Sequence, residues 1–341
     1  MTVISSSILN ERIGAFAQLG TTILSGSDEM EKAIAKARAE NPWFTDDFCR
    51  LAMLNIARHL LDEQKLTDWA KIITAALSPK TIAVVAAGNI PLVSFNDILC
   101  VLASGNKLLL KTSEKDSALT RFVLGELIKS LPGLENYISI SGTLKDFDAV
   151  IATGSNNTSR YFDYYFKDYP RIIKRNRTSL AILDGSETKA ELSGLAHDIF
   201  DYFGLGCRNV SHLLVPDGYD FTPLAEELRA FGHIADHHKY RNNLDYRRTI
   251  YLMNQIPFLN IDHINMTENE ALFSPISCLH YHFYKTEYDT HRYAVEHKDD
   301  LQCVVGRSGV CNVGFGETQK PGLTDYADKV DTMEFLQKIN L

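Results

Sequence analysis

The stretch Thr81-Ile-Ala-Val-Val-Ala-Ala-Gly88, followed further on by Lys107-Leu-Leu-Leu-Lys111, decides the fold class of this chain. Each is a short run of apolar residues, and the first ends in glycine, which is typical of a parallel strand buried on both faces. Between them, residues 92–103 have the pattern of a helix that ends at Gly105. A strand, a helix and a second strand in this order predict parallel strands joined by a crossover helix.

The same alternation continues through the chain. Residues before 80 are mainly helical, with Thr45 as the expected N-cap of a helix over 48–63 and a further helix over 68–77. Further strands are expected at 137–141, 148–152 and 171–174, and helices at 117–131 and 155–165. The second half gives strands at 180–183, 212–215 and 280–284, and helices at 189–203 and 222–231. We therefore predict an α/β protein with two doubly wound domains, a cleft between them and a C-terminal tail; the expected boundaries are 1–175, 176–325 and 326–341.

Composition narrows the class of protein. The chain has 341 residues, 45% of them apolar, which is enough for two ordinary cores. Its net charge is −8 without any basic block, which argues against a nucleic-acid partner. The longest apolar runs are strand-sized and the N-terminus lacks a secretory leader pattern, so we expect no membrane span and a cytoplasmic location. The six scattered cysteines form no Cys-x-x-Cys pair, so neither a metal site nor a disulfide framework is expected.

One of these cysteines has an informative setting. Cys207 lies in Asp201-Tyr-Phe-Gly-Leu-Gly-Cys-Arg-Asn-Val210, between an expected helix and the strand at 212–215. Gly204 and Gly206 leave room for a substrate to approach the sulfur, so Cys207 is a candidate nucleophile for acyl or aldehyde chemistry. From the residues alone, the alternative is a buried structural cysteine.

A side-chain amide follows the first strand at its carboxyl end, in Gly88-Asn-Ile-Pro91. Asn89 is either an ordinary turn residue or a fixed amide donor for a developing oxyanion. An amide suits the second role because it donates without having to change its protonation state.

Two further strand ends carry candidates for nucleotide binding, as expected at the carboxyl edge of a parallel sheet. Lys111 is a candidate for a ribose or phosphate contact, and Ser113 and Glu114 are candidates for ribose hydroxyls; a solvated strand end is the alternative. Gly154 and Ser155 open the helix over 155–165, and the first amides of a helix are a site for a diphosphate.

Taken in chain order, these segments resemble the aldehyde dehydrogenase superfamily over roughly residues 80–310. Four segments carry the resemblance: Ala87-Gly-Asn-Ile-Pro-Leu92, Leu102-Ala-Ser-Gly-Asn-Lys-Leu-Leu-Leu-Lys-Thr-Ser-Glu114, Gly204-Leu-Gly-Cys-Arg208, and Asn269-Glu-Ala-Leu-Phe-Ser-Pro-Ile276. The third is similar to the family's catalytic Gly-Gln-x-Cys motif, and the fourth to the motif that reaches the nicotinamide ribose. The resemblance implies an aldehyde-dehydrogenase-like fold, with Cys207 and Asn89 as catalytic residues. It also implies that Glu270 and Phe273 contact the cofactor.

Within this superfamily, the chain most resembles the acyl-CoA reductase branch typified by the fatty-acid reductase of bioluminescence (LuxC-like). The segments are Asn41-Pro-Trp-Phe-Thr45, Gly88-Asn-Ile-Pro91, Phe203-Gly-Leu-Gly-Cys-Arg-Asn-Val210, and the tail Phe315-Gly-Glu-Thr-Gln-Lys-Pro-Gly-Leu-Thr-Asp-Tyr-Ala-Asp328. This branch implies NADPH, bound by the first domain, with NADH as the alternative, and a role in fatty-acid metabolism. It also implies an acyl-CoA or acyl-protein thioester as substrate, and leaves a homodimer open, with the apolar segment Thr332-Met-Glu-Phe-Leu336 as a candidate contact.

The departures from the superfamily pattern are as informative as the matches. Aldehyde-oxidising members carry a glutamate that activates the hydrolytic water, whereas the comparable stretch here, Ile172-Ile-Lys-Arg-Asn-Arg177, contains no acid. Ser159 stands where many relatives have a second glycine. Ala271 stands where the ribose-binding glutamate usually lies, with Glu270 one residue early.

We therefore expect an oxidoreductase that reduces an acyl thioester to an aldehyde through an acyl-cysteine at Cys207. Two alternatives remain open at this point: an NAD(P)-dependent aldehyde dehydrogenase that makes free acid, and a catalytically silent relative that binds acyl groups or nucleotides. Product formation from aldehyde and NADP⁺ that depends on free CoA favours the reductase over the first alternative.

Overall fold

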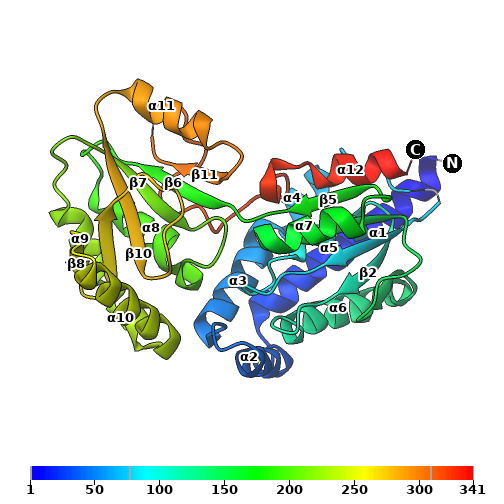
Figure 1. The fold of residues 1–341 in the computed structure, drawn as a ribbon. Coiled ribbons are helices and arrows are strands. Elements are labelled where there is room, and N and C mark those ends of the chain that lie inside the picture. The colour runs from blue at the N-terminus through cyan, green and yellow to red at the C-terminus, as the bar shows by residue number, and fades with distance from the viewer. Residues whose placement is uncertain (1, 77, 308, 341) are drawn as a thin grey trace. The chain divides into compact units, whose positions relative to one another are not determined.

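The computed structural model describes residues 2–76, 78–307 and 309–340 (Figure 1). The chain forms two compact units. Unit 1 comprises residues 1–176 and 320–341, and unit 2 comprises residues 177–319. The separate functions that the sequence assigns to the two domains stay a prediction.

The centre of unit 1 is a parallel sheet with the strand order β3-β2-β1-β4-β5. Its strands are β1 (Thr81–Val85), β2 (Lys107–Lys111), β3 (Ile138–Ile140), β4 (Ala149–Thr153) and β5 (Arg171–Lys174). Neighbouring side chains of β1 point to opposite faces, because Ile82 packs into one core cluster and Ala83 into another. Both faces are therefore covered, which is why the strands read as unbroken apolar runs.

Helices surround this sheet. They are α1 (Thr2–Ser25), α2 (Asp28–Glu40), α3 (Asp46–His59), α4 (Glu63–Ala70), α5 (Phe95–Ala103), α6 (Ala118–Ser130), α7 (Asn156–Tyr165) and α12 (Thr332–Ile339). Thr45 caps α3 as expected, since its side chain accepts a hydrogen bond from the amide of Phe48. The helix expected over 68–77 is wrong in its bounds, because α4 has already begun at Glu63 and ends at Ala70.

The C-terminal tail belongs to unit 1 (Figure 1, red). Its helix α12 packs against α5, and the apolar side chains of Met333 and Leu336 are buried in the core of unit 1. These two residues are therefore used within the chain itself. The homodimer stays a prediction.

Unit 2 contains the second sheet, with the strand order β11-β6-β7-β10-β9-β8. Its strands are β6 (Thr178–Ile182), β7 (Val210–Pro216), β8 (Leu259–Ile261), β9 (Ile264–Glu268), β10 (Cys278–Tyr284) and β11 (Leu301–Val305). All neighbours are parallel except β8 and β9, which pair antiparallel. The α/β fold with two wound sheets is thus confirmed.

The helices of unit 2 are α8 (Lys189–Phe200), α9 (Thr222–Arg229), α10 (His238–Met253) and α11 (Glu287–Glu296). The helix expected over 189–203 is wrong at its end, because Tyr202 and Phe203 adopt left-handed backbone angles, with φ of 55° and 58°. The sequence interpretation also missed α10. Most of its residues are polar, and Tyr240, Leu244 and Tyr251 form its narrow buried face.

A buried ion pair joins α5 to β5 in unit 1. The ammonium of Lys174 lies 2.5 Å from a carboxylate oxygen of Asp97, and both side chains are about 5% exposed or less. Each charge in such a pair compensates the desolvation of the other, so loss of one partner leaves an uncompensated charge in the core.

We expect Asp97→Ala to lower the free energy of unfolding by about 3–5 kcal/mol, because it leaves Lys174 buried without its partner. Urea denaturation followed by circular dichroism measures the change. The matched control is Asp68→Ala, which removes an exposed carboxylate paired with Lys71 and is expected to have little effect. Equal losses in the two variants would contradict the assignment.

Candidate active site

Cys207 lies in unit 2, half-buried, in a loop between the end of α8 and the start of β7. The loop reverses direction through Tyr202, Phe203 and Gly204, three consecutive residues with positive φ. A left-handed conformation costs about 1–2 kcal/mol for each residue that has a Cβ, so only Gly204 adopts it freely. The glycine interpreted from sequence as room for a substrate is therefore needed for the turn itself.

Packing opposes the strain of this turn. Tyr202 and Phe203 are both buried, and the ring of Phe203 lies 4.5 Å from the ring of His237 and 5.8 Å from that of Tyr240, between centroids. These contacts also attach the loop to the start of α10. Burial of two aromatic side chains recovers more free energy than the turn costs, by the usual value of about 25 cal/mol per Å² of apolar surface.

A hydrogen bond from Ser179 fixes the backbone of Cys207 to the sheet, and a second bond holds the hydroxyl of Ser179 in place. The hydroxyl of Ser179, on β6, donates to the carbonyl oxygen of Cys207 at 3.2 Å and accepts from the amide of Cys303, on β11, at 3.2 Å. The next side chain, Arg208, contacts the sulfur of Cys303 at 3.5 Å. The nucleophile candidate thus stands on a fixed backbone at the amino end of β7.

Asn89 lies in unit 1, exposed, in the turn that follows β1. Contacts hold the turn on both sides of it. The side-chain amide of Asn41 donates to the carbonyl of Gly88 at 3.2 Å, and the carboxylate of Asp116 accepts from the amide of Leu92 at 2.8 Å. A methyl group on Gly88 would collide with the hydroxyl of Ser113, so the turns after β1 and β2 pack directly together. The Asn41 segment singled out in the sequence therefore supports the turn that carries Asn89.

The predicted nucleotide-binding residues of unit 1 gather at one edge of its sheet. The last residue of β1, Val85, pairs with Lys111 of β2 and with Ala152 of β4, so the segments after all three strands begin side by side. Lys111 and Glu114 are exposed there, and Ser155 caps α7 by accepting from the amide of Thr158. A cation, a carboxylate and the first amides of a helix are a donor and acceptor set that fits a nucleotide.

Gly154 has a structural role as well. A Cβ at this position would come within 3.0 Å of Thr158 and Phe162, so the start of α7 packs tightly against its own first turns. Close approach of a diphosphate to Gly154 stays a prediction.

Glu270 and Phe273 lie exposed in the segment that links β9 to β10 in unit 2. This segment is attached to the strand that follows Cys207, because Ser211 donates to the carbonyl of Leu272 at 2.8 Å. Two buried histidines also contact it: Nδ1 of His212 and Nδ1 of His280 lie 3.0 and 2.8 Å from the carbonyl oxygen of Ala271. The structure thus brings the predicted ribose-binding segment onto the strand that starts beside the nucleophile.

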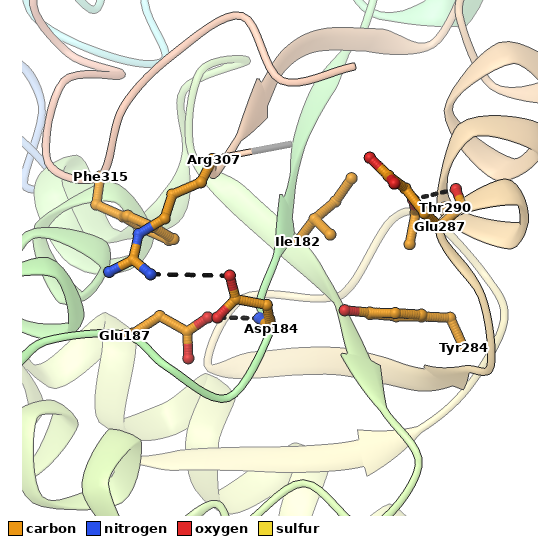
Figure 2. A pocket seen from close by; sticks show the side chains of 8 residues that line it. All are labelled: Ile182, Asp184, Glu187, Tyr284, Glu287, Thr290, Arg307 and Phe315. Carbon is orange, nitrogen blue, oxygen red and sulfur yellow. Dashed lines mark hydrogen bonds and ion pairs between the residues drawn. The ribbon is translucent and has the colours of Figure 1, made fainter. Parts of the chain in front are cut away.

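A pocket of about 290 Å³ lies at the opposite edge of the unit 2 sheet, at the carboxyl ends of its strands (Figure 2). Its lining residues are Ile182, Asp184, Glu187, Tyr284, Glu287, Thr290, Arg307 and Phe315. Figure 2 shows the guanidinium of Arg307 directed at Asp184, 3.7 Å away, and the same group also pairs with Glu191. Hydrogen bonds from Ser186 and Arg307 respectively lower the pKa values of Asp184 and Glu191, so both are ionised at neutral pH and suit ion pairing rather than proton transfer.

Residues 172–177 form the stretch comparable to the one that carries the water-activating glutamate in aldehyde-oxidising relatives, and several of its side chains are held by other contacts. Within residues 172–177, Ile172 is buried, Lys174 is paired with Asp97, and Arg175 is paired with Asp163 at 2.8 Å. Among the residues that the structure describes, no cluster of three or more His, Cys, Asp or Glu side chains is arranged to hold a metal ion. No helix in the same residues has the length and hydropathy that a membrane crossing requires.

Comparison with solved structures shows that the chain has the fold of aldehyde dehydrogenases. Aldehyde dehydrogenase 21 from Physcomitrella patens, solved with succinate, superposes with a TM-score of 0.70 over 99% of this chain and 86% of that one, at 10% identity. The NAD⁺ complex of an aldehyde dehydrogenase from Mycobacterium tuberculosis gives 0.63 over 88% and 73%, at 14% identity. An acetylating aldehyde dehydrogenase from Geobacillus thermoglucosidasius gives 0.59 over 88% and 76%, at 13% identity. These identities establish the fold alone.

A comparison with protein families gives a more specific assignment than the fold does. The model of the acyl-CoA reductase (LuxC) family matches residues 50–231, which include Asn89 and Cys207. The chain belongs to this family. Comparison with curated protein sequences gives no significant match.

His212, His280 and His282 form a cluster next to the segment that carries Glu270. Nε2 of His212 lies 2.7 Å from Nδ1 of His282, and the ring of Tyr293 stacks on His212 at 5.3 Å between centroids. Burial and the neighbouring His282 lower the pKa of His212 to about 3, and burial also lowers the pKa values of His280 and His282. Neutral His212 donates from Nδ1 to Ala271, so its Nε2 accepts from His282.

The pKa of His212 predicts how stability depends on pH. Its value is about 3 when folded and 6.5 when unfolded, so protonation favours the unfolded chain and the stability present above pH 6.5 is lost toward pH 3. Between pH 7.5 and pH 5, the free energy of unfolding should fall by about 2 kcal/mol less in His212→Gln than in the wild-type chain. Urea denaturation at the two pH values measures it. Exposed His233, changed to Gln, is the control for the loss of a histidine side chain.

Proposed function

We propose that this chain reduces an acyl thioester, a fatty acyl-CoA or an acyl-protein, to the aldehyde through a covalent acyl group on Cys207. The observation that carries the proposal is the match to the acyl-CoA reductase family over both Asn89 and Cys207, joined to a fixed loop that presents the thiol. The absence of an acid in residues 172–177 supports reduction over hydrolysis.

In the first step, the thiolate of Cys207 attacks the carbonyl carbon of the thioester. The carbonyl electrons move to oxygen, and the amide of Asn89, with the backbone N–H of Cys207, stabilises that oxyanion. When the oxyanion collapses, the bond to the leaving sulfur breaks. CoA or the carrier leaves as a thiolate, and the acyl group remains on Cys207.

A nicotinamide cofactor, NADPH in this proposal with NADH as the alternative, supplies the hydride when bound. Lys111, Ser113, Glu114, Gly154 and Ser155 would hold its nucleotide portion. Glu270 and Phe273 would contact its nicotinamide ribose.

Reduction of the acyl carbon leaves a second oxyanion on the carbon attached to Cys207, and the same two donors stabilise it. Its collapse breaks the carbon–sulfur bond, releases the aldehyde and restores the thiolate of Cys207. Residues 172–177 present no carboxylate to activate water, and this protects the acyl-enzyme from hydrolysis to free acid.

Incubation with acyl-CoA should increase the mass of the wild-type chain by one acyl group at Cys207, because the thiolate is the attacking group. We expect Cys207→Ser to abolish this gain, as read by intact mass and peptide mapping. Cys311→Ser is the matched control, since Cys311 is the other half-buried cysteine of unit 2 among the described residues. An acyl group that persists in Cys207→Ser, or no acylation of wild type at any chain length, would refute the proposal.

Removing the amide of Asn89 should slow turnover with little change in cofactor affinity. Loss of one oxyanion donor costs about 2.7–4 kcal/mol of barrier, so we expect Asn89→Ala to lower kcat roughly a hundredfold or more. Steady-state kinetics and a cofactor titration measure the two effects. Asn10→Ala, at an exposed position of α1, is the control; wild-type turnover in Asn89→Ala removes Asn89 from the mechanism.

A further inference from the structure

The end of α8 leaves backbone carbonyls that need hydrogen-bond donors, and Asn209 supplies them. Its side-chain nitrogen donates to the carbonyl oxygens of Asp198 at 3.1 Å and Asp201 at 2.8 Å, with a longer contact to Ile199 at 3.5 Å. The last turn of any helix has carbonyls without partners inside the helix. A side chain from beyond the loop thus caps α8, and the end of the helix is tied to the start of β7.

The same side chain holds the other end of the loop. Its Oδ1 accepts from the amide of Gly206 at 2.8 Å, and Asn209 is 2% exposed. The backbone carbonyl of Asn209 accepts from the amide of Ser179 at 3.1 Å, which fixes Asn209 to β6. Cys207 therefore lies between two anchored positions, Gly206 and Asn209.

These bonds are needed because the loop does not adopt its shape by local preference. Tyr202 and Phe203 are bulky residues in the left-handed region, which only glycine adopts without a steric cost. Aromatic packing offsets the strain of the turn, and the bonds of Asn209 add the constraint that fixes where the backbone of Cys207 stands after it. Asn209 donates to the carbonyls before the turn and accepts from the amide of Gly206 after it, so one side chain connects the two ends of the loop.

We infer that Asn209 is the positioning residue of the nucleophile, acting on catalysis through the backbone of Cys207. This rests on the proposed function, because Cys207 must be the attacking group for its placement to matter. A misplacement of about 1 Å in a reacting group can cost roughly a hundredfold in rate. The contribution of Asn209 should therefore appear in the chemical step and not in substrate affinity.

The test compares Asn209→Ala with Asn265→Ala. Asn265 is a fully buried asparagine of the same unit, on β9, whose side chain accepts from Arg248 at 3.3 Å. Both variants lose a buried amide, but only Asn209→Ala releases the loop. If Asn209→Ala is insoluble, Asn209→Asp keeps the acceptor for Gly206, removes the donors and takes its place.

Two measurements are made on each variant. With acyl-CoA and NADPH, we expect Asn209→Ala to lower kcat by at least about tenfold, while the KM for acyl-CoA changes by less than about threefold. Separately, the rate of alkylation of Cys207 by iodoacetamide, read by peptide mass, should change about fivefold or more in Asn209→Ala and less than about twofold in Asn265→Ala.

Alkylation needs neither the thioester nor the cofactor, so it separates this inference from the proposed function. If wild type reduces no thioester but the alkylation difference appears, the proposed function fails and the placement of Cys207 by Asn209 stands. Equal effects of the two substitutions on kcat and on alkylation, at matched thermal unfolding midpoints, would overturn the inference and leave Asn209 a structural residue.

Discussion

Burial of both faces of a parallel sheet is the constraint on which the rest of this structure depends. Strands such as β1 and β4 give most of their side chains to the two cores of unit 1, so its candidate polar residues lie at the edge of the sheet. The sheet of unit 2 also buries polar side chains, such as His212 and Ser179. In unit 1, the polar residues gather at the carboxyl edge. In unit 2, the thiol stands at the amino edge, before β7, while the carboxyl edge carries a pocket in which Arg307 is paired with Asp184.

This arrangement explains what the sequence predicted well. The buried strands stand out because their central residues are apolar, and β2 and β5 were predicted to the residue. Helix α10 was missed because its apolar stripe is narrow, although the spacing of Tyr240, Leu244 and Tyr251 was a usable signal. The end of α8 was misjudged because Tyr202 and Phe203 favour ordinary helical angles, and only Gly204 hinted at a left-handed turn.

The residues of the candidate site also fall into two groups: those that the sequence indicated and those that it did not. Cys207 and Asn89 could be proposed from sequence because each lies in a segment that resembles a motif of the aldehyde dehydrogenase superfamily. Ser179 and Asn209 could not, because their roles depend on partners that become neighbours only after folding. The hydroxyl of Ser179 bridges Cys207 and Cys303, which are 96 residues apart in the sequence, and the amide of Asn209 reaches back to a helix end. Supporting residues of this kind carry no local pattern.

The pair of Lys174 and Asp97 also bears on how this chain could change its chemistry over evolution. The superfamily resemblance aligns β5 and the residues after it with the segment that supplies the hydrolytic glutamate. Here the last side chain of β5 is committed to the core. A Glu at position 174 alone would face the carboxylate of Asp97 where water is excluded, and their repulsion would destabilise the fold. An acid at this position therefore requires a coupled change at Asp97, so the core of unit 1 limits which side chains the end of β5 can carry.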